Sequence, residues 1–440
     1  MKKLEDNYQI FFYLVLIIIF FKVFIFYDHY PYHDEITTFD RYLEWHRVFR
    51  KDAPNNHFIL SVIGILTKYI FGFNFLVLRF ISFVFFILIS LYFIKNFKNF
   101  YLILIFFLII FSSKIIFNYS YVFRGYYLSS FLSVLIFIDL VSIYIYKNKK
   151  NLKITFLLCF LLFAHSLYTL YIVAPVLFVT FVNSLNIRKF YKYFLEFFVY
   201  FFIPTIIIIY LNIFVTGFAE KFSGNLNIDF ILNNFLLVLK ESFEPGFKAI
   251  FLNDYVSQNN SSLLSSFANN AVLLFRADFT IFCILLTALI ISLIKSYMKK
   301  IDILDKIVIS FFIFYLLIGR EPFLRIYVGI IYFFIFYIFF NIPDFKIPKK
   351  KYFKIVYLLV FILALFNIQP SRNNQEVKSQ IHKIDKSNLT CEEFNSFLDD
   401  YEIWVLINFY QDKCYYYWDG KKNVLGSTKM NNLYKKRFSE

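Results

Sequence analysis

The sequence has few charged residues for its length. Asp, Glu, Lys and Arg together make up 17% of the 440 residues, hydrophobic residues make up 60%, and the mean hydropathy is +0.61. This composition excludes a soluble domain of the same length, because apolar runs of roughly 18–20 residues recur along the chain. Such spans have to be helices, since lipid leaves no other partner for their backbone groups. The predicted fold class is an all-α polytopic membrane protein.

The sequence also lacks a basic domain with a nucleic-acid-binding motif, although its net charge is +16 at pH 7. Most of the lysines fall in short segments between apolar runs, which is the positive-inside pattern of membrane proteins. Nucleic acid is therefore excluded as a partner, and membrane lipids are expected instead.

No small-residue cleavage site follows the first apolar run, which extends from Ile10 to Tyr27. Asp28-His29-Tyr30 comes next, so the run is not the core of a cleaved signal peptide. We predict a retained first span with the N-terminus in the cytoplasm, and composition favours the bacterial inner membrane.

The spacing of the basic clusters predicts the topology. Two apolar runs separate each cluster from the next when all the clusters are placed on the cytoplasmic side. The clusters are Lys95/Lys98, Lys147/Lys149/Lys150/Lys153, Arg188/Lys189/Lys192, Lys295/Lys299/Lys300/Lys306 and Lys346/Lys349/Lys350/Lys351/Lys354. The runs between them are residues 100–117, 127–146, 154–168, 169–187, 194–216, 271–294, 307–319 and 325–341.

One apolar segment, residues 57–72, is too short for a span and carries Lys68, so we expect it to lie in the membrane interface. Residues 36–50 have an apolar and a charged face and predict a second interfacial helix. Both fall in one outward loop, residues 28–74.

The topology then has about eleven spans in a domain of residues 1–368, with a second long outward loop at 217–270. Residues 369–440 form a small mixed or β-containing extracytoplasmic domain. Its segment YYYWDG, residues 415–420, is typical of a strand.

Cysteine is rare, with four in the chain. Cys159 and Cys283 lie in predicted spans, whereas Cys391 and Cys414 lie in the polar tail. An outward tail is in an oxidising compartment, so we predict a Cys391–Cys414 disulfide. The alternative is two free thiols in a tail that faces the cytoplasm, which would reverse the topology.

Ionisable residues gather near the outward ends of the predicted spans. His33, Asp34 and Glu35 follow the first span directly. Taken alone they are typical of a solvated loop, but charges at membrane depth are costly unless they face a cavity or a partner. A polar cavity that opens outward is therefore predicted. The other outward groups are Lys114, Arg124, His165, Arg276, Asp278, Arg320, Glu321 and Arg325.

Such a cavity suits a lipid-phosphate substrate. The prenyl chain would lie in the bilayer, and the phosphate would meet Arg or Lys through charge-assisted hydrogen bonds. Glycosyl transfer needs a carboxylate to take a proton from the attacking hydroxyl. It also needs positive charge to stabilise the phosphate leaving group.

At this point the residues resemble the GT-C glycosyltransferases, and in particular the protein mannosyltransferase and aminoarabinose transferase group. Asp34-Glu35 match the Asp-Glu pair of that group, Asn55-Asn56-His57-Phe58 loosely match its His-Pro-Pro-Leu-Tyr stretch, and Gly72 with Arg79 match its Gly…Arg. The likeness covers roughly residues 10–180.

Two further stretches carry the resemblance. SYVFRGYYLSSF (120–131) is similar to the Arg-x-Tyr corner of the second outward loop, and LRIYVGIIYF (324–333) is similar to a late Arg-Tyr stretch. The family implies a polyprenyl-phosphate sugar donor and an inverting transfer to an extracytoplasmic acceptor.

The resemblance implies roles for the outward residues. Asp34 is the expected general base, and Glu35 shapes the site or binds a sugar hydroxyl. Arg124 and Arg325 are expected to bind the donor phosphate, with Arg320 as a weaker candidate.

The remaining expected substrate-binding residues are His33, His57 and Tyr126. His57 is expected to orient the acceptor, and the alternative is a helix cap. For Arg124 and Arg325 the alternative is an anchor for lipid headgroups.

No cofactor is predicted. His33, Asp34, Glu35 and His57 leave a divalent metal open as an alternative. However, neighbouring side chains in a loop rarely converge on one ion, and the second outward loop lacks the Asp that some relatives have there.

Two other functions stay open, and so does an enzyme-like scaffold without activity. An O-antigen-type polymerase or ligase also has a long late outward loop, but residues 217–270 contain no arginine. A transporter or flippase for lipid-linked sugars would be expected to have paired halves, which the sequence does not show. Asp139 lies alone in a span, either as a proton relay or bonded to a neighbouring helix.

Overall fold

The structure is a computed structural model, and it divides the chain into two units. The first comprises Met1–Ile19 and Arg41–Asn367, and the second comprises Phe20–Asp40 and Ile368–Glu440. The residues that the structure describes are 17, 57–72, 75–97, 99–148, 151–166, 169–185, 187–208, 274–275, 278–318, 324–342, 416–418 and 423–425.

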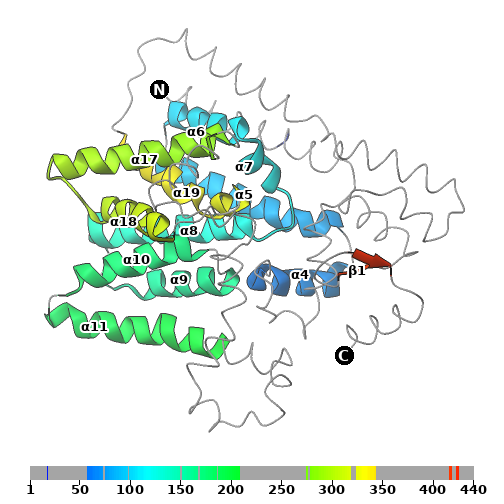
Figure 1. Cartoon of the computed structure of the whole chain (residues 1–440), viewed down its shortest axis with the longest axis horizontal. Helices are drawn as coiled ribbons and strands as arrows, with labels where there is room; N and C mark the ends of the chain where they lie inside the picture. The colour runs from blue at the N-terminus through cyan, green and yellow to red at the C-terminus, as the bar shows by residue number, and fades with distance from the viewer. Residues whose placement is uncertain are drawn as a thin grey trace, which may run out of the picture. The chain divides into compact units, whose positions relative to one another are not determined.

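The first unit is helical throughout the described residues (Figure 1). Each predicted apolar run that falls on them folds as helix, which confirms the helical class. The helices are α4 Phe58–Phe71, α5 Phe75–Phe97, α6 Phe100–Ser112, α7 Lys114–Tyr119, α8 Tyr126–Leu140, α9 Lys153–His165, α10 Leu170–Asn183, α11 Ile187–Phe197, α17 Phe279–Tyr297, α18 Ile303–Ile318 and α19 Leu324–Asn341. The π-helical turns η2 Val141–Ile145 and η4 Phe198–Phe202 continue α8 and α11.

Four helices in the described part of the chain are long and apolar enough to cross a membrane, as judged by length and composition. They are Val77–Phe97, Tyr126–Ile145, Phe190–Ile208 and Phe279–Tyr297. Helices of this kind are typical of an integral membrane protein. The segment predicted to lie in the interface forms α4, which is apolar but shorter than a span.

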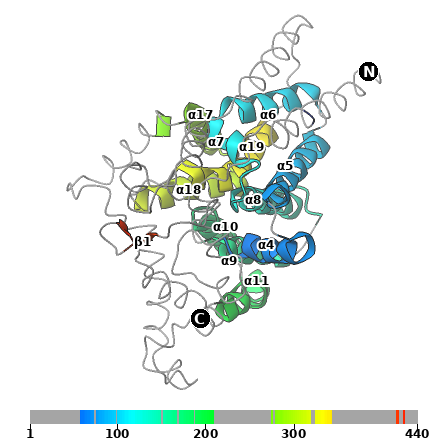
Figure 2. The same cartoon turned by 90° about the vertical axis from the view of Figure 1, so that its right-hand side faces the viewer.

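The helix α8 lies at the centre of the first unit. It packs against α5, α9 and α19, and both views place it between α5 on one side and α9 and α10 on the other (Figure 1 and Figure 2). In its apolar window 61% of the residues are buried, against 11% for Phe190–Ile208. Most side chains of α8 therefore face protein, whereas most of those in the α11 segment are not buried.

Small residues bring α8 and α19 close together. Ser130 Oγ donates to the carbonyl of Val328, and Ser133 Oγ donates to that of Gly329 at 3.1 Å. A Cβ atom on Gly329 would lie 3.1 Å from Ser129 Cβ. Serine and glycine at helix contacts are a common means of close packing in membrane proteins.

The run 100–117 was predicted as one span, but in the structure it is divided into two helices, α6 and α7, with a break at Ser113. Ser113 Oγ accepts from the N–H of Ile116 at 3.1 Å and so caps α7. The same hydroxyl donates to Asp278 Oδ2 at 2.6 Å, and Asp278 caps α17 by accepting from the N–H of Ile281 at 3.0 Å. The two helix starts therefore share one hydrogen-bonded cap.

A partly buried ion cluster joins α17, α18 and α19 at Lys295, which belongs to one of the basic clusters read from the sequence. Lys295 Nζ lies 2.6 Å from Asp302 Oδ2 and 2.9 Å from Asp305 Oδ2. It also donates to Asn341 Oδ1 at 2.8 Å, and Tyr337 donates to Asp305 Oδ1 at 2.6 Å. One ammonium thus holds the turn between α17 and α18 against the end of α19.

The second unit contributes two short strands to the described residues. Strands β1 Tyr416–Trp418 and β2 Asn423–Leu425 pair antiparallel, with Tyr417 opposite Val424. The strand β1 falls on the YYYWDG segment. The tail domain as a whole lies outside the described residues and stays a prediction.

Candidate functional site

The structure describes part of the predicted site. The side chains of His57, Arg124 and Tyr126 are described, and the backbone of Arg325 lies in the first turn of α19. Among the described residues no group of three His, Cys, Asp or Glu side chains is placed to hold a metal. The predicted residues His33, Asp34, Glu35, Arg320, Cys391 and Cys414 lie outside the described residues.

Three helix ends meet around Gly125. Gly125 is the N-cap of α8, His57 is the N-cap of α4, and His165 is the last residue of α9. A Cβ atom on Gly125 would lie 2.0 Å from His165 Nε2 and 2.7 Å from His57 Cγ. Both imidazole rings therefore occupy the space that a side chain at position 125 would need.

A hydrogen bond holds His165 in this place. His165 Nε2 lies 2.9 Å from the carbonyl oxygen of Gly125, and it must donate because a carbonyl oxygen only accepts. The rings of His165 and His57 are 5.1 Å apart between centroids. The sequence marked His165 as an outward ionisable residue but assigned it no role. Only its contact with Gly125 shows that it belongs to the site.

The starts of α4 and α8 lack side-chain caps. His57 stands at the N-cap position but makes no side-chain cap bond, and Gly125 has no side chain to offer. The first-turn N–H groups of a helix have no partner within the helix and carry partial positive charge. Two such helix starts lie side by side here, an arrangement that favours an anion.

Arg124 is the cationic residue next to this corner in the sequence. It directly precedes Gly125, and its side chain is 0% exposed. Its backbone N–H donates to the carbonyl of Val122 at 2.7 Å. A guanidinium buried to this extent lies inside the protein rather than at its lipid-facing surface, which weighs against the headgroup-anchor alternative.

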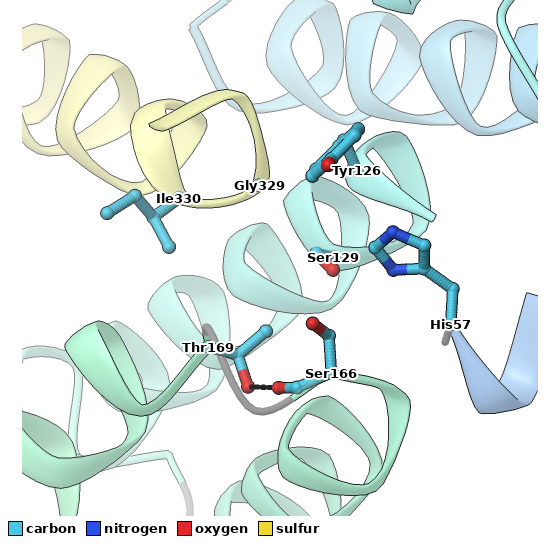
Figure 3. Close-up of a pocket in the computed structure, with 7 residues that line it drawn as sticks. All are labelled: His57, Tyr126, Ser129, Ser166, Thr169, Gly329 and Ile330. Atoms are coloured by element: carbon cyan, nitrogen blue, oxygen red, sulfur yellow. Dashed lines mark hydrogen bonds between the residues drawn. The ribbon is translucent and has the colours of Figure 1, made fainter. Parts of the chain in front are cut away.

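Tyr126 connects the corner to a small polar cavity. Its ring meets those of His57 and Tyr119 edge-on, each at 5.0 Å between centroids. The cavity has a volume of about 10 Å³, the room of one water molecule. Figure 3 shows its lining, which comes from α4, α8, α19 and the turn between α9 and α10. The lining residues are His57, Tyr126, Ser129, Ser166, Thr169, Gly329 and Ile330.

A larger apolar cavity lies among α17, α18 and α19. Its volume is about 220 Å³. Two tyrosines that line it are bonded to each other, with Tyr327 OH donating to Tyr315 OH at 2.9 Å. Tyr327 stands between Arg325 and Gly329 on α19. The lining residues are Leu274, Phe282, Leu285, Leu286, Leu289, Phe311, Phe312, Tyr315 and Tyr327.

Two further residues singled out in the sequence are placed by the structure. Arg79, from the Gly…Arg resemblance, is buried in α5. Asp139 Oδ2 accepts from Thr155 Oγ1 at 2.6 Å, so it bonds α8 to α9. Of the two alternatives for Asp139, the bond to a neighbouring helix is the one found.

The site described so far is a corner where the starts of α4 and α8 meet the end of α9, with a small polar cavity next to it, and a larger apolar cavity lies among α17, α18 and α19. Comparisons of the chain with protein families, with curated proteins and with solved structures find no match. The chain is therefore characterised by its membrane helices and by this corner.

Proposed function

We propose that the chain is a membrane glycosyltransferase. It would move a sugar from a polyprenyl-phosphate donor to an extracytoplasmic glycan, lipid or protein acceptor by an inverting mechanism. The donor and the acceptor are its substrate partners.

The observation that carries the proposal is the corner at Gly125. Two helix starts without side-chain caps meet at Gly125, and the buried Arg124 directly precedes this residue. A phosphate can accept hydrogen bonds from the first-turn N–H groups of a helix and from a guanidinium at the same time. During transfer the same groups stabilise the charge that develops on the phosphate leaving group.

The apolar cavity among α17, α18 and α19 supports a lipid-linked donor. Its lining is almost wholly aliphatic and aromatic, which suits hydrocarbon rather than a sugar. Arg325 precedes Tyr327 by two residues on α19, so the helix that lines this cavity also carries a candidate phosphate ligand. Arg320 is the weaker candidate.

The chemistry of transfer is assigned to the first outward loop. Asp34 acts as general base and removes the proton of the acceptor hydroxyl as its oxygen attacks the sugar. Glu35 shapes the site or binds a sugar hydroxyl, and His33 and His57 contact the substrate. No cofactor is required in this scheme, and a divalent metal at these residues is the alternative.

We also propose the finer topology. The chain has about eleven spans in the bacterial inner membrane, with the N-terminus in the cytoplasm. Residues 369–440 then form a periplasmic domain with a Cys391–Cys414 disulfide.

The test is transfer of radiolabelled sugar from a panel of polyprenyl-phosphate sugars to extracted envelope acceptors. Wild type is compared with Asp34→Asn at matched expression. Asp229→Asn, which makes the same change in the second long outward loop, is the control. We expect wild type and the control to incorporate label and Asp34→Asn to lose at least about 100-fold in rate, as for a general base.

Two outcomes would contradict the proposal. Full transfer by Asp34→Asn would remove the base assignment. No incorporation by wild type with any donor would remove the function itself and favour the polymerase or transporter alternatives.

A further inference from the structure

The small polar cavity beside the corner is lined by the buried hydroxyl of Ser166, which has no hydrogen-bond partner among the described residues. We infer that this cavity binds a single unsubstituted hydroxyl group of the transferred sugar and so acts as a specificity site. The inference rests on the proposed function, because the sugar arrives on the donor.

Ser166 supplies a buried hydroxyl to the lining of the cavity. Its side chain is 4% exposed, and Ser166 Oγ has no hydrogen-bond partner among the described residues. The neighbouring Thr169 differs, because its hydroxyl donates to the carbonyls of Leu162 and Ser166 at 2.8 and 2.7 Å. Buried hydroxyls are nearly always hydrogen-bonded, and an oxygen atom held in the cavity would give the Ser166 hydroxyl its partner.

The hydroxyls in the cavity lie where one ligand atom could meet them together. Figure 3 shows Ser129 and Ser166 reaching toward one another across the space from α8 and from the end of α9, with the His57 ring beside them. A sugar hydroxyl can both donate and accept, as can each serine. It could therefore bridge the two side chains as a water molecule would.

The size of the cavity sets what can enter. Its volume of about 10 Å³ admits one oxygen atom with its hydrogen and excludes an acetamido group or a second sugar. Gly329 forms one wall, and a Cβ atom there would lie 3.1 Å from Ser129 Cβ and 3.7 Å from Ser129 Oγ. Helices α8 and α19 are thus as close as a glycine permits, so the cavity cannot widen without moving a helix.

The cavity also lies within reach of a sugar on the proposed donor. His57 and Tyr126 line it, and the same two residues flank Gly125, where the phosphate is proposed to bind. A sugar joined to a phosphate at this corner would have its ring hydroxyls near the residues that line the cavity.

The test pairs an enzyme hydroxyl with a substrate hydroxyl. Ser166→Ala and wild type are assayed for kcat/KM with the active polyprenyl-phosphate sugar and with a series of its monodeoxy analogues. Ser90→Ala is the matched control, because Ser90 is a buried serine of α5 outside the cavity. Ser129→Ala is a second variant from the opposite wall, used in the same way if Ser166→Ala does not fold.

We expect Ser166→Ala to lower kcat/KM about tenfold with the parent donor, an effect of one lost hydrogen bond. With one deoxy analogue, the one that lacks the bound hydroxyl, wild type and Ser166→Ala should have equal kcat/KM. Ser90→Ala should leave the whole series unchanged.

Three outcomes would overturn the inference. Equal loss by Ser166→Ala across the whole series, or no loss at all, would mean that the cavity holds only a structural water. Donors that carry a bulky group on one hydroxyl, tested at each hydroxyl in turn, are a further comparison. If wild type transferred all of them as fast as the parent donor, the cavity would not select for an unsubstituted hydroxyl. Absence of transfer by wild type with any donor would instead refute the proposed function, and the inference would fall with it.

Discussion

Gly125 is the residue on which the candidate site depends, because two imidazole rings occupy the place of its missing side chain. His165 approaches from α9 and His57 from α4, and both rings contact the start of α8. The hydrogen bond from His165 to the Gly125 carbonyl fixes the backbone just after Arg124. A single glycine therefore allows both histidine rings to approach the backbone that follows Arg124.

Replacing this glycine tests the arrangement at the scale of one residue. In Gly125→Ala the added methyl group would lie 2.0 Å from His165 Nε2, so the two histidine rings must move. We expect this overpacking to lower the free energy of unfolding by about 1–3 kcal/mol. The melting temperature in detergent and the transfer rate are the measurements, and both should fall.

Ser120→Ala is the control for that substitution, since it changes a buried residue five positions before Gly125 without adding an atom. It should melt close to wild type. An unchanged melting temperature for Gly125→Ala would mean that the two histidines do not occupy this space.

At the scale of elements, the helices are joined by polar groups at a few points and by aromatic and aliphatic packing elsewhere. Asp139 and Thr155 bond α8 to α9, and the Ser113–Asp278 cap bonds α7 to α17. Polar pairs of this kind are individually modest in membrane proteins but specify which helices are neighbours. The Lys295 cluster is the largest of them in the described residues.

Removing the ammonium of that cluster should loosen α17, α18 and α19 together. In Lys295→Met the carboxylates of Asp302 and Asp305 lose their shared counter-ion, and Asp305 is fully buried. Because Lys295 itself is partly exposed, we expect a loss of about 1–3 kcal/mol, less than for a fully buried pair. The melting temperature in detergent should drop, whereas exposed Lys300→Met should have little effect. Equal melting temperatures for Lys295→Met and Lys300→Met would refute a stabilising role for the cluster.

At the scale of the whole molecule, the proposed function depends on the orientation of the chain in the membrane. The proposed site has to lie on the extracytoplasmic side, where the sugar would be transferred from its lipid-linked donor. The basic clusters predict a tail outside the cytoplasm, and the tail contains Cys391 and Cys414. Cys159 and Cys283 are free thiols in helices. The redox state of the tail cysteines therefore reports the orientation of the chain.

Alkylation of the denatured protein tests this prediction. Without a reductant we expect two of the four cysteines to react, and with a reductant all four, because an oxidising compartment pairs the tail cysteines. Mass spectrometry counts the adducts, and Cys391→Ser should give three adducts under both conditions. Four adducts on wild type without a reductant would place the tail in the cytoplasm.

The apolar runs in the sequence predicted much of the fold, but the sequence predicted less of the candidate site. The runs predicted helices at every described span, and the short segment 57–72 became α4. The break at Ser113 was not predictable, because its partner Asp278 lies 165 residues away. His57 and Tyr126 were named from sequence and are brought together. His165 and Ser166 were not assigned to the site, since nothing local in the sequence marks a residue that meets Gly125 or faces Ser129.

The sequence by itself determined that this is a helical membrane protein. Composition and hydrophobic period act locally, and every apolar run in lipid must bond its own backbone. Tertiary structure decided which helix ends meet. The convergence of α4, α8 and α9 on Gly125, and the cavity between Ser129 and Ser166, depend on close packing between helices far apart in the chain. Such packing is set by the shapes of all the neighbours at once, which no single stretch of sequence contains.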